Sequence, residues 1–389
     1  MKNILILYPY RFRNYDYDRF ELRFLKKKYN IIILDILDLI HPHFKEAYKK
    51  EKLNFKVIKP KNIKNLFFFL KKYKNLSNTI IFNFNTSINL KALIVNLFIK
   101  KLNIAIYGFY IPGNFFWDAK NLPILKRLLF YIKQNIYDPK RVIWNLRSRF
   151  YLFLNFIFNV KLDYLFVAGK KYIPKKNLFK KIFEINSWDY SRLKLYKKKI
   201  KKKKIYITFL DAPGPLFKSD SFLLKRNNDE TAENTYPSLR NFFDNIEKTF
   251  GSQVVIAAHP KTKHVNYPKY FGERKVIHNK TLELIHKSNL VITRNSSAIT
   301  YAIYYKIPII FIYTKEIKKK KNVNFYNIYY LAKELNLEAI NINSYKEKLI
   351  KKKIFNLSKY QDFEKKYFSN INSNKPNHEL IHQAIMSNK

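Results

Sequence analysis

Residues 289–313 read NLVITRNSSAITYAIYYKIPIIFIY, and this stretch decides the fold class. The runs NLVITRN (289–295) and IPIIFIY (307–313) are short and apolar, as is typical of strands that are buried on both faces of a parallel sheet. The segment SSAITYAIYYK (296–306) between them predicts a helix. Strand, helix and strand in this order predict a right-handed βαβ crossover, which is the building unit of an open α/β sheet.

The same alternation continues toward the N-terminus of this half of the chain. It comprises a strand IYITFLD (205–211), a polar loop to about residue 234, a helix SLRNFFDNIEKTF (238–250), a strand QVVIAAHP (253–260) and a helix TLELIHKS (281–288). Gly251 follows the first of these helices as a C-terminal stop signal. One α/β unit is therefore expected over this half.

An earlier series of apolar runs predicts a second sheet. Its strands are NILILY (3–8), NIIILDIL (30–37), TIIFNFN (79–85), NIAIYGFY (103–110) and LDYLFVAG (162–169). The lysine run KLYKKKIKKKK (194–204) reads as a solvated connector between the halves. We therefore expect two Rossmann-like domains with a central cleft: residues 1–195 with a helical insertion at 115–160, residues 205–345, and a helical tail at 346–389.

Composition narrows the function classes. The 389 residues carry a formal net charge of +48, contain no cysteine and only six glycines, and form no G-x-G-x-x-G or Walker A sequence. Nicotinamide-dependent oxidoreductases and P-loop kinases are excluded on this ground. Lys, Ile, Asn, Phe and Tyr share A/T-rich codons, and the sequence contains no motif of a known nucleic-acid-binding module. We therefore interpret the positive charge mainly as a basic surface in contact with solvent. A nucleic-acid partner is not expected, and contact with an anionic membrane remains an alternative.

Neither a signal peptide nor an apolar segment long enough to cross a bilayer is found in the sequence. We expect a cytoplasmic protein, with a peripheral position at the inner membrane face as the finer hypothesis. The insertion mixes aromatic side chains with Lys and Arg, as in FFWDAKNLPILKRLLFYIKQ. This composition suits either a helix at a membrane interface or a packed helix pair.

The first candidate site is His259-Pro260-Lys261, which directly follows the strand QVVIAA. In open α/β sheets, ligands bind beyond the carboxyl ends of the strands. His259 can donate a hydrogen bond or a proton to a phosphate oxygen there, and Lys261 adds a positive charge for the same anion. The alternative is a histidine whose hydrogen bonds are satisfied by the backbone of a turn.

The second candidate site is Arg294-Asn295-Ser296-Ser297, between a strand and a helix. Serine hydroxyls and backbone N–H groups at a helix N-terminus form a site for anions. The alternative is that Asn295 or Ser296 simply caps the helix, and capping is compatible with phosphate binding.

Together, the sequences VVIAAHPKTK and LVITRNSSAITYAIYYKIPIIFI resemble bacterial polysaccharide glycosyltransferases of the GT-B type. These include polysialyltransferases, related sialyltransferases and the Kdo transferases of capsule assembly, and the resemblance covers roughly residues 205–315. It implies that His259, Ser296 and Ser297 hold the phosphate of a CMP-activated donor, and that His259 eases departure of the nucleotide. Lys261 and Arg294 are further candidates for binding this phosphate because of their place in the two segments.

The site also requires a general base for the acceptor hydroxyl. The families named above use an acidic D/E-D/E-G motif, which this sequence does not contain cleanly. Asp211 in FLDAPGP is the preferred candidate, because the turn after it aims its carboxylate along the sheet edge. The alternative for Asp211 is an Asx turn.

Further candidates follow the first strand, in YPYRFRNYDYDRF: Arg11, Arg13, Asp16 and Asp18. They would face the acceptor, since the N-terminal half of such enzymes usually binds it. The alternative for Asp18 is the N-cap of a following helix, with Glu21 completing a capping box.

The hypothesis from sequence is an inverting, metal-independent glycosyltransferase without a cofactor, which moves a sugar from a nucleotide-activated donor to a surface glycan or lipid-linked glycan. Two alternatives stay open. One is a teichoic-acid-type glycerophosphotransferase, and the other is a protein without enzymatic activity that binds polyanions.

Overall fold

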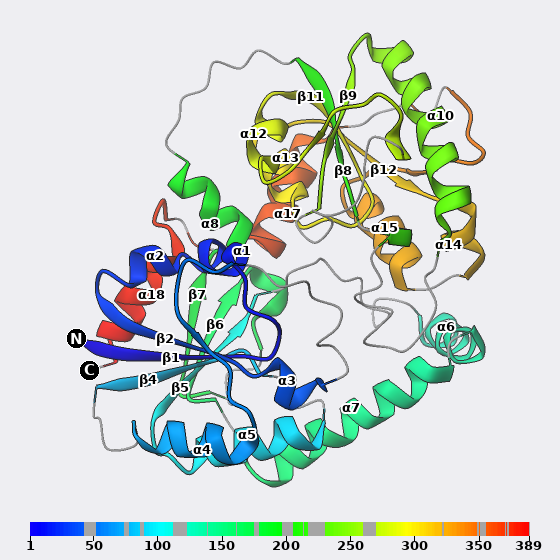
Figure 1. Cartoon of the computed structure of the whole chain (residues 1–389). Coiled ribbons are helices and arrows are strands. Elements are labelled where there is room, and N and C mark those ends of the chain that lie inside the picture. The colour runs from blue at the N-terminus through cyan, green and yellow to red at the C-terminus, as the bar shows by residue number, and fades with distance from the viewer. Residues whose placement is uncertain are drawn as a thin grey trace.

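The computed structural model describes residues 1–42, 52–73, 78–85, 89–111, 123–137, 139–160, 162–174, 179–196, 205–212, 214–216, 230–259, 270–320, 323–347, 350, 355–369, 371 and 373–388. Two parallel sheets organise these residues (Figure 1). The first has seven described strands in the order β3-β2-β1-β4-β5-β6-β7, and the second has six in the order β10-β9-β8-β11-β12-β13. Every described strand pair is parallel. The predicted pair of Rossmann-like domains is thereby confirmed.

The first sheet is apolar on both faces because β1 alternates between two cores. Ile4 and Ile6 pack on one face, whereas Leu5 and Leu7 pack on the other. The strands are β1 (Lys2–Tyr8), β2 (Tyr29–Asp35), β3 (Val57–Ile58), β4 (Thr79–Asn83), β5 (Ala105–Tyr110), β6 (Tyr164–Ala168) and β7 (Lys181–Ile185). The helices and turns around them are α1 (Asn14–Arg19), α2 (Leu22–Leu25), α3 (Leu37–Ile40), α4 (Ile63–Lys71), α5 (Leu90–Lys100), η3 (Lys170–Tyr172) and α8 (Trp188–Leu195).

The second sheet repeats this strand order, so its first and fourth strands are also neighbours. Its strands are β8 (Tyr206–Leu210), β9 (Val254–Ala257), β10 (Val276–Ile277), β11 (Ser288–Thr293), β12 (Ile309–Tyr313) and β13 (Ala339–Asn341). Its helices and turns are η5 (Gly214–Leu216), α10 (Ala232–Phe250), α12 (Thr281–His286), α13 (Ile299–Tyr304), α14 (Lys315–Lys320) and α15 (Val323–Glu334). The point where the strand order reverses lies between β8 and β11, which is where open sheets of this kind place their ligands.

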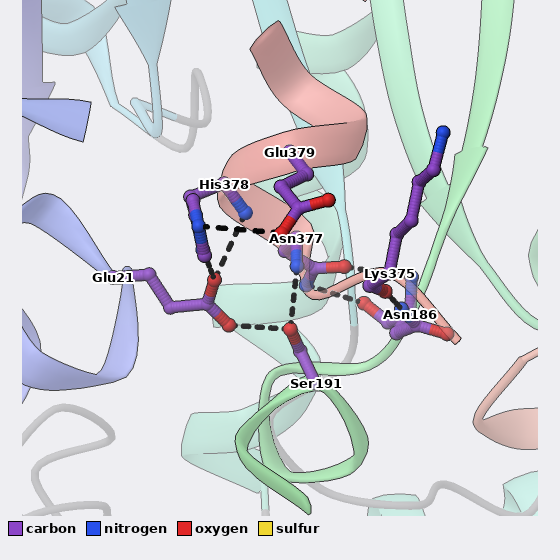
Figure 2. Close-up of polar contacts among 7 residues, drawn as sticks. All are labelled: Glu21, Asn186, Ser191, Lys375, Asn377, His378 and Glu379. Carbon is purple, nitrogen blue, oxygen red and sulfur yellow. Dashed lines mark hydrogen bonds and ion pairs between the residues drawn. The ribbon is translucent and has the colours of Figure 1, made fainter. Parts of the chain in front are cut away.

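The C-terminal segment returns to the first domain. Helix α17 (Leu357–Tyr367) packs against α13 and η3, and α18 (Asn377–Met386) packs against α2 and β7. Figure 2 shows the polar contacts of this return, with Glu21 bound to Ser191 of α8 and to both the backbone N–H and the Nδ1 of His378, at 2.9 and 2.8 Å. The two termini therefore lie side by side at the first sheet (Figure 1).

The junction between the domains is a packed core. One apolar cluster includes Val167 of β6 and Leu193 of α8 from the first half, together with Val291 of β11 and Phe363 of α17 from the second. Gly169 follows β6 with a φ of +75°, and an added Cβ there would lie 2.5 Å from the carbonyl oxygen of Lys366. The end of α17 thus rests directly on the backbone of the first domain.

The insertion forms two helices, α6 (Ile124–Tyr137) and α7 (Pro139–Ile157). Helix α7 contacts α5, and Lys100 Nζ donates a hydrogen bond of 2.9 Å to the carbonyl oxygen of Phe158. Helix α6 reaches the second domain, where the Phe130 and Tyr326 rings meet edge to face. No helix of the described segments is both long and apolar enough to cross a bilayer.

Several local predictions are wrong in detail. Asp18 is not an N-cap, because α1 begins at Asn14 and Asp16 accepts the N–H of Arg13 at 3.1 Å instead. The helix expected at 296–306 begins only at Ile299, and α10 begins at Ala232 and runs through Pro237. Strand β13, between α15 and α17, was not expected from the sequence.

Candidate functional site

The candidate residues of the second domain follow three neighbouring strands, β8, β9 and β11. Leu210 pairs with Ala257 and Phe209 pairs with Ile292, and the N–H of Asp211 donates a hydrogen bond of 3.1 Å to the carbonyl oxygen of Ala257. Continuing this register places Asp211 level with Arg294 on the adjacent strand, at the usual strand spacing of about 4.8 Å. Asp211 and Arg294 therefore flank the point where the strand order reverses.

His259 lies two residues beyond β9, after the buried Ala258, and is half-buried. It belongs to the same carboxyl edge, on the strand that neighbours β8 on the other side from β11. The structure thus brings His259, Asp211 and the loop after β11 to one edge of the second sheet. Lys261 lies outside the described residues.

Arg294 is buried and its guanidinium is held by a carboxylate that sequence reasoning missed. Its Nη1 lies 2.5 Å from Glu230 Oε2, and the other oxygen of Glu230 accepts the Thr314 hydroxyl at 2.6 Å. Arg294 and Glu230 are only 5% and 6% exposed. Glu230 precedes α10 at the end of a polar loop, where a lone acidic residue gave no pattern to detect.

Gly214 packs directly against this ion pair. A Cβ at Gly214 would lie 3.1 Å from Arg294 Nη1 and 3.4 Å from Glu230 Oε2, and its φ is +29°. The turn that follows Asp211 is therefore fixed in place by the same pair that fixes the loop after β11. The Nε of Arg294 is buried and has no hydrogen-bond partner within the described residues.

The charges at this edge act on Tyr236 of α10. Burial raises the pKa of the Tyr236 hydroxyl, the negative charge of Asp211 raises that pKa further, and the positive charge of Arg294 opposes both. Asp211, Arg294 and Tyr236 are thus close enough to interact electrostatically. Tyr236 is a second residue that sequence reasoning missed, because it precedes the helix predicted at 238–250 and belongs to no recognised motif.

The Ser296-Ser297 loop is half-buried and its backbone donors point to no described acceptor. Ser296 Oγ accepts the N–H of Ala298 at 3.3 Å, and the carbonyl oxygen of Ser297 accepts the N–H and the hydroxyl of Thr300 at 3.1 and 2.8 Å. Within the described residues, the N–H groups of Ser296 and Ser297 donate no hydrogen bond to the protein. They and the serine hydroxyls remain available to a ligand.

The helix after this loop is shorter than expected. It has six residues, its N-cap is Ala298, and no side chain caps it. Neither Asn295 nor Ser296 is therefore the N-cap of this helix, contrary to the alternative expected from the sequence. A helix this short contributes little dipole, and an anion at the loop would depend on hydroxyl and N–H donors. One turn after Ser297, the Tyr301 hydroxyl donates a hydrogen bond of 3.1 Å to Asp189 of α8. The serine loop therefore lies next to the first domain.

The N-terminal candidates make contacts within their own domain. Arg11 is bound to Asp35 at 3.2 Å and to Asp38 at 2.6 Å. Asp16 is buried and accepts hydrogen bonds from the Tyr8 hydroxyl at 3.2 Å and the Arg13 N–H at 3.1 Å. Such contacts hold the loop between β1 and α1 in place.

Two further properties distinguish the acidic candidates of this loop. Burial raises the pKa of the Asp16 carboxyl, and the neighbouring Arg13 and Arg19 oppose that shift. Asp18 lies on the exposed side of α1. Neither residue lies on the second sheet with His259. Among the described residues, no group of three or more His, Asp and Glu side chains is placed to hold a metal ion.

No family model and no curated protein matches this chain. Among solved structures, Acinetobacter baumannii MurG aligns over 90% of this chain and 89% of its own, with 8% identity and a TM-score of 0.44. A putative UDP-N-acetylglucosamine 2-epimerase from Listeria monocytogenes aligns over 100% of this chain and 96% of its own, with 10% identity and a TM-score of 0.49. The wall teichoic acid polymerase TagF aligns over 100% of this chain and 90% of its own, with 14% identity and a TM-score of 0.48. At these identities and TM-scores, the likenesses do not show an activity of this chain.

Proposed function

We propose that this protein is a glycosyltransferase whose nucleotide-sugar donor binds at the carboxyl edge of the second sheet, with its phosphate on His259 and the Ser296-Ser297 loop. The observation that carries the proposal is the convergence of these residues and Asp211 at the ends of β9, β11 and β8. Unused N–H donors, serine hydroxyls and an imidazole are groups that bind phosphate oxygens.

The proposed reaction transfers the sugar from the donor phosphate to an acceptor hydroxyl, with Asp211 and His259 in separate roles. The acceptor hydroxyl oxygen attacks the anomeric carbon, and the bond from that carbon to the phosphate oxygen breaks, so that the electron pair leaves with the nucleotide. Asp211 takes the proton of the acceptor hydroxyl, and His259 donates a hydrogen bond or a proton to the departing phosphate. Arg294 acts through the loop it supports, because Glu230 already balances its charge.

The finer proposal concerns the donor and the acceptor. The likeness of the HPK and NSS segments to polysialyltransferases and capsule Kdo transferases favours a CMP-linked 2-keto acid sugar and metal-independent, inverting transfer. The acceptor is proposed to be a bacterial surface glycan or lipid-linked glycan that approaches from the first domain. Tyr301, which joins the helix after the serine loop to Asp189, supports a site adjacent to that domain.

The test is a thermal-shift titration with CMP, UDP, GDP, dTDP, their sugar conjugates and CDP-glycerol. One nucleotide class should raise the melting temperature by about 5 °C near saturation. His259→Ala and Ser297→Ala should remove this shift, whereas Ser344→Ala, an exposed serine beyond β13, should retain it. Turnover of the matching sugar conjugate should fall in the same two variants.

The outcomes separate the alternatives. Selectivity for CMP supports the 2-keto acid donor, and selectivity for UDP or GDP contradicts that finer proposal while retaining the transferase. A response to CDP-glycerol alone indicates glycerophosphate transfer. No response to any nucleotide, together with steeply salt-dependent binding of polyanions, would reject an enzyme of this kind.

A further inference from the structure

The helix pair α6–α7 carries most of the exposed apolar surface of the molecule. Of the 24 large hydrophobic side chains that are exposed in the described residues, 14 lie between Ile124 and Phe158. Scattered apolar residues on a surface are ordinary, but a concentration of this size on one helix pair marks an interaction surface. The two helices stand out from the packed layers of both sheets (Figure 1).

Five exposed apolar side chains of α7 form one stripe along the helix, and the exposed Leu152 and Phe156 lie beside it. Ile143, Leu146, Phe150, Phe153 and Ile157 follow each other at spacings of three and four residues and are 55–67% exposed. Such spacing places them on a single face. The opposite side of α7 is the covered one, because Ser148 is 8% exposed and the helix contacts α5. The stripe therefore has no covering element among the described residues.

Basic residues border this stripe. Arg147 and Arg149 are both exposed and, by helical spacing, lie on either side of the line through Leu146, Phe150 and Phe153. Over residues 123–160, the sequence has seven Lys or Arg residues and one acidic residue, Asp138. A helix with an apolar face and a basic border suits the boundary of an anionic bilayer, where apolar side chains enter the acyl region and cations meet the headgroups.

We propose that the α6–α7 pair docks the protein onto a bilayer of anionic lipids, with α7 lying in the plane of the interface. Charge complementarity selects this occupant over a second copy of the chain, because two surfaces with the same basic border repel each other. The 19 residues of α7 span about 28 Å, so the stripe offers a long contact parallel to the membrane. This inference is independent of which group the enzyme transfers.

Vesicle sedimentation with the full chain tests the proposal. Binding is measured to vesicles of phosphatidylcholine alone and of phosphatidylcholine with phosphatidylglycerol in about a 2:1 ratio. The wild type should prefer the anionic vesicles, and added salt should weaken that preference. Phe153→Ser should lower the partition coefficient about tenfold, because one exposed aromatic side chain no longer enters the acyl region.

The matched control is Phe68→Ser on α4, where the Phe68 side chain is 67% exposed away from the stripe. It should bind vesicles like the wild type, and both variants should melt like the wild type because both positions are exposed. Equal losses in Phe68→Ser and Phe153→Ser, no vesicle binding, or no preference for anionic lipid would overturn the proposal. A dimer in light scattering that Phe153→Ser dissociates, without vesicle binding, would assign the stripe to a second copy.

Discussion

At the scale of single residues, the site depends on a buried ion pair that connects three segments. Glu230 binds Arg294 after β11 and Thr314 after β12, and Gly214 lies against the pair in the turn after Asp211. A buried pair of this kind does not by itself stabilise a protein strongly, but removal of one partner leaves an uncompensated charge. The pair therefore explains how these loops keep a fixed arrangement.

We predict that Glu230→Gln lowers the free energy of unfolding by about 3 kcal/mol, because the Arg294 charge stays buried without its counter-charge. Thr314→Val should cost only about 2 kcal/mol, since it removes the two hydrogen bonds of the hydroxyl, to Glu230 and from the Ile317 N–H, and leaves the ion pair intact. Chemical denaturation of the variants measures both. Equal costs, or a Glu230→Gln cost below that of Thr314→Val, would contradict the role assigned to the pair.

At the scale of elements, helices α17 and α18 join the two domains. Asn377 at the start of α18 exchanges hydrogen bonds with the backbone of Asn186 at 2.9 and 2.8 Å, and its own N–H binds Ser191 Oγ at 2.6 Å (Figure 2). Glu21 takes part in the same network from a left-handed backbone conformation, with φ of +55°. The helical tail is thus part of the first domain's surface.

We predict that Gly169→Ala displaces the end of α17, because the new Cβ would meet the backbone of Lys366 and Tyr367 at 2.5–2.8 Å. Limited proteolysis should then cleave within 357–388 at an increased rate. Gly251→Ala is the control: its φ is +60° but nothing lies within 4 Å, so it should cost about 1 kcal/mol without exposing the tail. Equal protection of the tail in both variants would contradict this account of the junction.

The long apolar strands could be predicted from the sequence because their pattern is local. The runs at 3–8, 79–85, 253–260 and 289–313 were among those that predicted both sheets and the edge that carries His259 and Ser297. Strands β10 and β13 were missed, since two or three residues give no periodicity. Strand β7, KIFEI, mixes charged and apolar residues at the sheet edge and was also missed.

Contacts between distant segments had no local signal. Glu21 and His378 are 357 positions apart, and Glu230 and Arg294 are 64 apart. The sequence does not show whether a carboxylate is buried. It therefore could not distinguish Glu230 from the acidic residues of a solvated loop. The capping alternative for Asp18 failed for a local reason, because α1 begins at Asn14 and Asp16 is the carboxylate that accepts the Arg13 N–H.

At the scale of the whole molecule, two sheets of the same strand order share an apolar junction, and the serine loop lies beside it. Gly214 lies against the buried ion pair at the second sheet's carboxyl edge, and the Tyr301–Asp189 hydrogen bond links the helix after the serine loop to the first domain. The exposed stripe of α7 lies on a separate helix pair. Donor binding and membrane docking are therefore assigned to different surfaces of one chain.

The most direct test of the proposed donor site is hydrogen–deuterium exchange of the full chain with and without saturating CMP or UDP, whichever shifts the melting temperature. The account predicts slower exchange in peptides that contain Ser296 and Ser297 and in those that contain His259, with the first-domain loop at Arg11 unchanged. Protection confined to that first-domain loop, or no protection at the second sheet's edge under saturating nucleotide, would contradict it.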